Sequence, residues 1–93
     1  MSDFTQGPFS VAETRHKYDI VIRGPKNEPI ALVLIAGFSK KEGAANANLL
    51  AAAPDLLAAL IELADCGAEA WGEDRPCVKL ARAAIARATG EQP

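Results

Sequence analysis

The apolar pattern divides the chain into a first part that predicts strands and a second part that predicts helices. Three early segments combine β-branched or aromatic residues with turn signals at their ends, and they are Phe9–Glu13, Tyr18–Arg23 and Ile30–Ala36. Gly7-Pro8 precedes the first segment, and the loop 24–29, which contains two prolines, separates the last two. Short connections of this kind favour a three-stranded antiparallel meander.

The third of these segments is apolar on both faces of the expected strand. One face carries Ile30, Leu32 and Leu34, and the other carries Ala31, Val33 and Ile35. The helices of so small a domain cover only one face of a sheet, so the second face needs other cover. Small domains often reach adequate burial by association, and we therefore expect a homodimer. The alternative is that the segment Phe4–Phe9 folds over the open face.

From residue 43 on the pattern becomes helical, with 16 alanines in 51 residues and Trp71 as the sole aromatic residue. One helix is expected over Glu42–Ala52, with a stripe formed by Ala45, Leu49 and Ala53. A second is expected over Pro54–Cys66, because proline fits a first helical turn. The two segments form either separate helices or one kinked helix.

The second expected helix carries a core-facing stripe, and Gly67 is its expected C-cap. A last helix is expected over Arg75–Ala88 with its end at Gly90. The residues expected to face inward are Leu56, Leu57, Leu60, Ile61 and Ala64 on one helix and Cys77, Val78, Ala81, Ala84, Ile85 and Ala88 on the other. The predicted fold class is α+β: residues 1–38 form the sheet, residues 42–89 form two or three helices packed on one face, and 1–93 is a single domain.

Composition and charge exclude several classes of protein. The net charge is −2, with 10 basic and 12 acidic residues, whereas a generic polyanion binder carries a basic excess. The start of the chain lacks the layout of a signal peptide, and polar residues interrupt the longest apolar run, 44–64. Two cysteines are too few for a disulfide framework. We therefore expect a cytoplasmic protein with reduced thiols and no membrane span.

No residues with the spacing of a catalytic or metal site are apparent. His16 is the only histidine and lies in a polar connection, and two distant cysteines add no recognisable zinc spacing. Cys66 and Cys77 are interpreted as small buried residues at helix ends. We therefore expect no enzyme activity, no metal and no cofactor.

The strongest candidate surface lies around the last interhelical turn. Arg75, Lys79 and Arg82 follow an i, i+4, i+7 spacing on the last helix. They could grip phosphates or an acidic partner surface, or they could pair with acidic residues of the preceding helix and turn. Those acidic residues are Glu62, Asp65, Glu69, Glu73 and Asp74. Trp71, in the same turn, is either a lid on the core or an exposed contact anchor.

Three stretches of the sequence carry the motifs of a known family. Thr5-Gln6-Gly7-Pro8-Phe9 is similar to the Thr-Pro-Gly-Pro-Trp opening of that family, and the segment from Ala45 to Leu60 matches its Ala-Asn-Ala-x-Leu-Leu-Ala-Ala-Ala-Pro-Asp-Leu-Leu-x-Ala-Leu core. The tail 81–90 is also similar, so the chain resembles a group of small phage and prophage proteins. The chain departs from the group at Gln6, Phe9 and Asn48. The resemblance implies a phage accessory protein, and it carries over no catalytic residues.

The resemblance and the missing chemistry together favour an anti-defence protein. Small phage accessory proteins without catalytic residues commonly block host machinery, so we expect an anti-CRISPR that occludes a CRISPR effector by protein–protein contact. The residues expected to bind the partner are Glu69, Trp71, Glu73, Asp74, Arg75, Lys79 and Arg82. One alternative is an oligomeric sponge that gathers Lys40, Lys41 or Arg82 around a nucleotide immune signal. Another is a small nucleic-acid-binding regulator.

Overall fold

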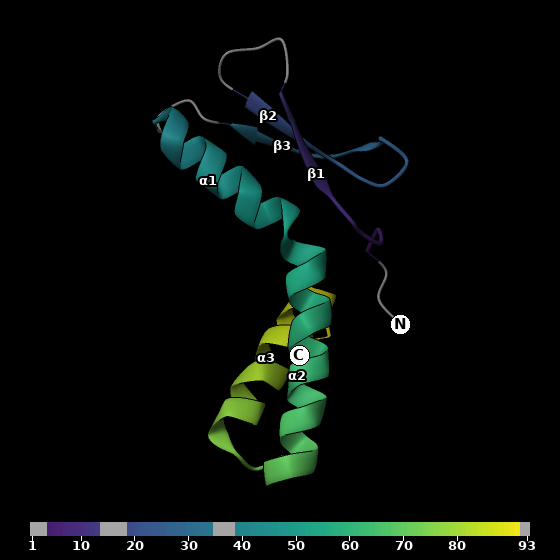
Figure 1. Ribbon diagram of the computed structural model, residues 1–93, viewed down its shortest axis with the longest axis vertical. Helices are drawn as coiled ribbons and strands as arrows, with labels where there is room; N and C mark the ends of the chain where they lie inside the picture. Colours follow the sequence, from purple (N-terminus) through teal and green to yellow (C-terminus); the bar gives the residue numbers. More distant parts are fainter. Residues whose placement is uncertain (1–3, 14–18, 35–38, 92–93) are drawn as a thin grey trace. The chain divides into compact units, whose positions relative to one another are not determined.

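A computed structural model describes residues 4–13, 19–34 and 39–91 of the chain. Three strands precede three helices (Figure 1), and they are β1 (Ser10–Glu13), β2 (Asp19–Arg23), β3 (Pro29–Leu34), α1 (Lys40–Ala51), α2 (Ala53–Trp71) and α3 (Pro76–Thr89). The predicted α+β fold class is confirmed. The chain divides into two compact units: a sheet unit, Thr5–Asp55, and a hairpin unit, Leu56–Pro93 with Met1–Phe4. The expectation of a single domain stays a prediction.

The sheet is the predicted antiparallel meander, with β2 between β1 and β3. Val11 on β1 and Ala31 on β3 both lie opposite Ile22. The register between β2 and β3 shifts near Arg23, because Ile30 is an extra residue on β3. The observed strands lie within one residue of the predicted starts, and the predicted positions Tyr18, Ile35 and Ala36 fall outside the described residues.

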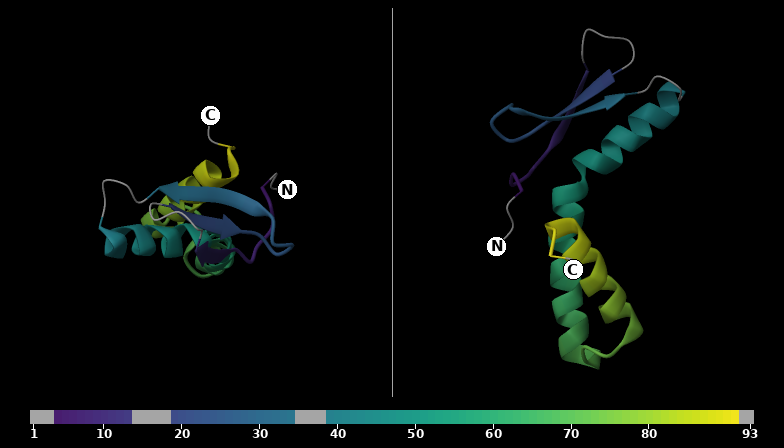
Figure 2. Two further views of the ribbon diagram at one scale, coloured as in Figure 1. Left: turned by 90° about the horizontal axis from the view of Figure 1, so that it is seen from above. Right: turned by 180° about the vertical axis from the view of Figure 1, so that it is seen from behind.

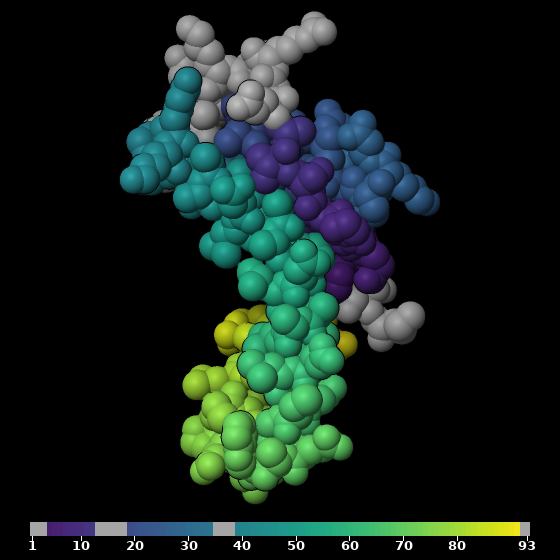
Figure 3. All heavy atoms as spheres, viewed as in Figure 1, coloured from purple at the N-terminus to yellow at the C-terminus, as the bar shows by residue number. Residues whose placement is uncertain are grey.

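α1 lies against one face of the sheet (Figure 2). Its smallest side chains make the contact. Ile22 points at the helix and is 1% exposed, and Ala47 is fully buried beside Ala51. The half-buried residues around them are Phe9, Ile20, Ile30 and Val33. The atoms of α1 lie directly against those of β1 in the space-filling view (Figure 3). Gly43 completes the buried stripe of this helix.

The predicted stripe of Ala45, Leu49 and Ala53 is not the buried face of α1. All three residues are exposed, and Leu49 is on the outer side of α1. A helix that lies this close to a sheet needs Gly or Ala at the contact, because a longer side chain would hold the backbones apart. Side-chain size therefore decides the buried face here, rather than hydrophobicity alone.

The sheet face opposite α1 exposes large apolar side chains. Leu32 is 54% exposed and Leu34 is 62% exposed. Phe9 packs with Ile22 on the α1 side, so this residue of the Phe4–Phe9 segment does not cover the open face. Phe9 therefore does not provide the cover of the open sheet face that the sequence suggested for the segment Phe4–Phe9. The homodimer stays a prediction.

The two expected helices around Pro54 are separate. Ala52 lies between them and is the C-cap of α1, and its N–H donates to the Asn48 carbonyl at 3.0 Å. Pro54 occupies the first turn of α2, where its missing N–H leaves no bond unmade. Gly7 lies against this proline, since a Cβ at Gly7 would come within 2.8 Å of Pro54 Cβ. The opening motif thus packs against the core motif within the sheet unit.

The prediction that Gly67 caps the second helix is wrong. α2 continues through Gly67 to Trp71, because Ala68, Glu69 and Ala70 are good helix formers. Gly67 is buried, and a Cβ there would lie 3.2 Å from Val78 Cγ2. The helix ends instead at Gly72, whose φ is +92°. The predicted end of the last helix at Gly90 is confirmed by its left-handed φ of +75°.

The interface between α2 and α3 is a narrow stripe of small residues. Ala64, Gly67 and Val78 are buried in it. The predicted inward residues that are half-buried are Leu57, Leu60, Ala81, Ala84 and Ile85. The predicted inward residues that are exposed are Leu56, Ile61, Cys77 and Ala88, and Cys66 is exposed as well. The interpretation of both cysteines as buried is therefore wrong, because two paired helices bury only the stripe between them.

Candidate protein-interaction surface

Trp71 is the last residue of α2, and it is 61% exposed. Its ring lies over Gly67, since a Cβ at that position would be 3.7 Å from Trp71 Cε3. The guanidinium carbon of Arg75 lies 5.7 Å from the centre of the ring, in a cation–π arrangement. The indole is thus held in place although most of it faces solvent. Of the two readings of Trp71, a core lid is excluded by this exposure.

Arg82 joins α3 to α2 and to the turn between them. Its Nη1 donates to Asp65 Oδ1 at 2.8 Å, and its Nη2 and Nε donate to the two carboxylate oxygens of Glu73 at 2.9 and 3.3 Å. The hydrogen bonds to Glu73, and next the one to Asp65, raise the pKa of Arg82 above its usual value. Arg82 is ionised at every accessible pH, so this shift brings no titration. Its guanidinium is engaged within the hairpin.

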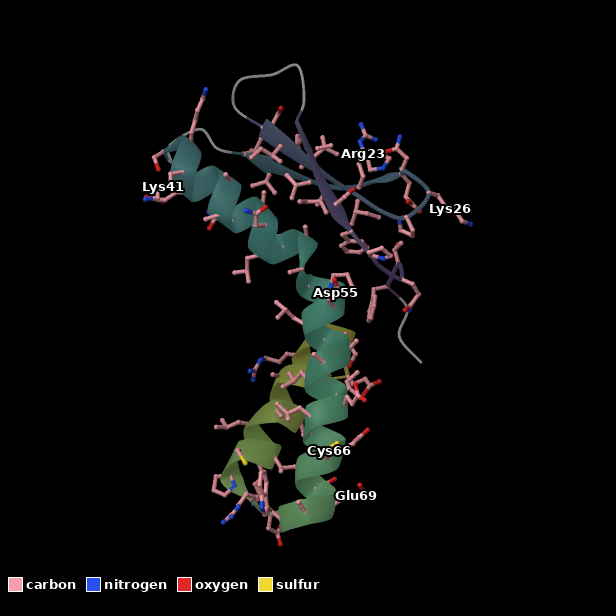
Figure 4. The ribbon with its side chains drawn as sticks, in the orientation of Figure 1. Arg23, Lys26, Lys41, Asp55, Cys66 and Glu69 are labelled. Carbon is pink, nitrogen blue, oxygen red and sulfur yellow. The ribbon has the colours of Figure 1, made fainter. Side chains whose placement is uncertain are left out.

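The other predicted partner-binding residues lie on the surface around this turn. Glu69, Asp74, Arg75 and Lys79 are all exposed, and Glu69 projects from the end of α2 (Figure 4). We call Glu69, Trp71, Asp74, Arg75 and Lys79 the turn surface. Arg82 and Glu73 differ from these five, because their charged groups bind each other.

The turn surface has the composition of a protein-binding site. Tryptophan and arginine are the residues most enriched at binding hot spots, and here they are in contact with each other. Acidic and basic groups surround them, which favours a partner with a mixed charge pattern over a uniform polyanion. Leu63 and Leu80 are exposed on the same hairpin unit, at 69% and 72%, but neither belongs to the turn surface.

The described residues also bear on metal binding, on thiols and on membrane spans. Within residues 4–13, 19–34 and 39–91, no cluster of three His, Cys, Asp or Glu side chains could hold a metal ion. Cys66 and Cys77 are free thiols, and His16 lies outside the described residues. Across the same ranges, none of the helices has the length and apolar character to span a membrane.

Lys40 and Lys41 lie in the first turn of α1, beside the Ser39 cap. Both are exposed, and Ser39 Oγ accepts a hydrogen bond from the Glu42 N–H at 3.0 Å. The third residue named for a phosphate site, Arg82, already binds two carboxylates.

Sequence reasoning missed two residues that shape this surface. Gly67 was expected at a helix end, yet it lets the Trp71 ring and Val78 approach the α2 backbone. Asp65 was only one member of an acidic cluster, yet it binds Arg82 across the hairpin. The available signal for Gly67 was the unbroken run of helix formers after it, which continues to Trp71.

The fold and the surface define a small α+β protein with exposed side chains suited to binding. Comparison with protein families identifies it further: the model of the family described as Salmonella phage P22 protein Y8K6 matches residues 1–92. The chain therefore belongs to this family of phage proteins, which agrees with the phage resemblance of its sequence motifs. No curated protein and no solved structure matches it.

Proposed function

We propose that this phage protein is a non-enzymatic inhibitor that binds a host defence complex and occludes its working surface. A CRISPR effector is the first candidate, so the protein would be an anti-CRISPR. The observation that carries the proposal is Trp71, a large aromatic side chain that is held in one place and is mostly exposed. Large apolar side chains held in such positions are typical of interaction sites.

The hairpin supplies what an interface anchor needs. The Arg75 guanidinium lies over the indole and the α2 backbone at Gly67 lies against it, so little side-chain entropy is lost when a partner covers it. Arg82 ties Asp65 on α2 to Glu73 in the turn and thereby fixes the turn itself. A binding surface that is already rigid loses less free energy on association.

The residues of the turn surface have different roles in this proposal. Trp71 and Arg75 form the centre of the contact, and Glu69, Asp74 and Lys79 form a charged rim that selects the partner. Arg82 and Glu73 act indirectly by holding the turn. The sponge alternative has weaker support, because a phosphate would have to compete with Asp65 and Glu73 for the Arg82 guanidinium.

The test is binding of the purified protein to purified CRISPR effector complexes, the multisubunit Cascade type and the Cas9 type, by biolayer interferometry. We expect one of them to be bound, and we expect Trp71→Ala to weaken that binding by about thirtyfold or more, the effect of a hot-spot residue. Leu80→Ala is the matched control, since it removes an exposed apolar side chain from the same unit and should change binding little. Absence of binding to both classes, or a Trp71→Ala variant that binds as well as the parent, would contradict the proposal.

A further inference from the structure

The sheet face opposite α1 carries a continuous apolar row across all three strands. Ala12 on β1 lies opposite Val21 on β2, and Val21 lies opposite Leu32 on β3. Residues directly opposite each other in a sheet share a face, and Ile22, the neighbour of Val21, points to α1. The row therefore lies on the outer face, where Leu34 extends it along β3.

We propose that this face binds a second copy of the same chain, sheet against sheet, around a two-fold axis that runs along the Ala12–Val21–Leu32 row. An axis that lies between the two sheets and across their strands places each residue of the row against itself. It also places Leu34 of one copy near Pro29 of the other, because both flank Leu32 on β3. The apolar pattern is thus complementary to itself, as an interface between identical subunits requires.

Charge on β2 selects this orientation. Asp19 and Arg23 lie on the same face as Val21, two residues away from it in opposite directions. With the axis across the strands, Asp19 of one copy lies against Arg23 of the other, which gives two pairs of opposite charge. With the axis along the strands, Asp19 would meet Asp19 and Arg23 would meet Arg23, which is unfavourable. The charge pattern therefore predicts that the two β2 strands run in opposite directions.

The size of the face sets the expected strength of the association. The two outer strands of a three-stranded sheet lie only about 10 Å apart. A face this narrow buries less surface area than a standard protein interface. The dimer is therefore expected to be weak, with dissociation in the micromolar range. It would concern the sheet unit and does not depend on the proposed role of the turn surface.

The first test is sedimentation velocity of the full chain over a concentration series. The parent should shift from a monomer of 9.8 kDa towards a dimer as concentration rises. Leu32→Glu places two carboxylates on the axis and should weaken dimerisation by at least roughly tenfold. Leu80→Glu is the control, because it places the same charge at an exposed leucine of α3 and should leave the dimer intact. Far-UV circular dichroism verifies that each variant is folded.

The second test exchanges the charges. Asp19→Lys and Arg23→Glu should each weaken the dimer, because each brings like charges together. The double variant should recover part of the lost association, since Lys at position 19 again meets Glu at position 23 of the other copy. A chain that stays monomeric at all concentrations, a dimer that tolerates Leu32→Glu, or a double variant no better than the singles would overturn the proposal.

Discussion

Gly7 and Gly67 lie where another element comes within van der Waals distance of the backbone. Pro54 closes on Gly7 in the sheet unit, and Val78 with Trp71 closes on Gly67 in the hairpin unit. A side chain at Gly7 would have less room than one at Gly67. A new Cβ at Gly7 would lie 2.8 Å from Cβ of Pro54, which belongs to a rigid ring, whereas a new Cβ at Gly67 would lie 3.2 Å from Val78 Cγ2. The glycine of the opening motif is therefore explained by packing.

Gly7→Ala should lower the free energy of unfolding by about 1–3 kcal/mol, the usual range for adding a methyl group to a filled contact. The measurement is urea denaturation followed by circular dichroism. Ser10→Ala is the control, since Ser10 is exposed and surface substitutions change stability by about 0.5 kcal/mol or less. A Gly7→Ala variant as stable as the parent would show that Pro54 does not limit this position.

A second prediction at the level of a single residue concerns Arg82. Arg82→Gln removes the charge that binds Asp65 and Glu73, and it should lower the thermal midpoint of unfolding. Arg82→Lys keeps the charge but not the planar fork, so its midpoint should fall between the other two. The differences should shrink at about 1 M salt, because both carboxylates are largely exposed and the ion pairs are screened. Three midpoints that do not differ at low salt would contradict this role.

The sequence allowed some of these residues to be anticipated and others not. Spacing placed Arg75, Lys79 and Arg82 on one side of a helix, but spacing does not show which carboxylate reaches which guanidinium. The exposure of Cys66 and Cys77 was missed for a related reason. Both cysteines fit an apolar helix face, and only the packing of α2 on α3 decides how wide the buried stripe is.

At the scale of elements, α1 shows how side-chain size sets a helix–sheet contact. Its buried positions are Gly43, Ala47 and Ala51, and its leucines Leu49 and Leu50 are exposed. The helix therefore approaches the sheet closely and gains contact with Ile22 and its neighbours. A larger residue in this stripe would push the helix away.

Ala47→Leu should destabilise the protein by about 1–3 kcal/mol through overpacking. Ala45→Leu is the matched control, because it makes the same substitution in the same helix at an exposed position. Its effect should stay within about 0.5 kcal/mol. Chemical denaturation of both variants measures the difference. Equal effects at the two positions would show that α1 does not pack through the Ala47 side.

The sequence predicted the type of each element better than its limits. Strand alternation and alanine content were sufficient for three strands, for helix on both sides of Pro54 and for a last helix ending at Gly90. They left open whether the chain around Pro54 forms two helices or one kinked helix. The end of α2 was placed at Gly67 because glycine is a frequent C-cap. Close contact with Val78 is a different use of glycine, and it depends on tertiary packing that one sequence does not reveal.

At the scale of the whole molecule, family membership and the exposed surfaces bear on function. The phage family agrees with the motif resemblance. The turn surface and the outer sheet face are the two candidate binding regions, and each belongs to one unit. Neither the partner nor the occluding activity follows from fold class, because fold alone does not determine function.

The engagement of Arg82 leads to a prediction about small ligands. A panel of cyclic and linear nucleotides should leave the thermal midpoint unchanged in differential scanning fluorimetry. A ligand present at a hundred times its dissociation constant would stabilise the fold by about 2.7 kcal/mol, which this method detects readily. Stabilisation by one nucleotide, lost in a Lys40→Ala/Lys41→Ala variant, would favour the sponge over the protein-binding inhibitor.

The most direct measurement of the inhibitory role is the plating efficiency of a CRISPR-targeted phage on immune bacteria that express this protein. The account predicts that the parent and Leu80→Ala restore plaques and that Trp71→Ala, expressed at the same level, does not. Full immunity in the presence of the parent, across hosts with Cascade-type and Cas9-type systems, would contradict it, and so would restored plaques with Trp71→Ala.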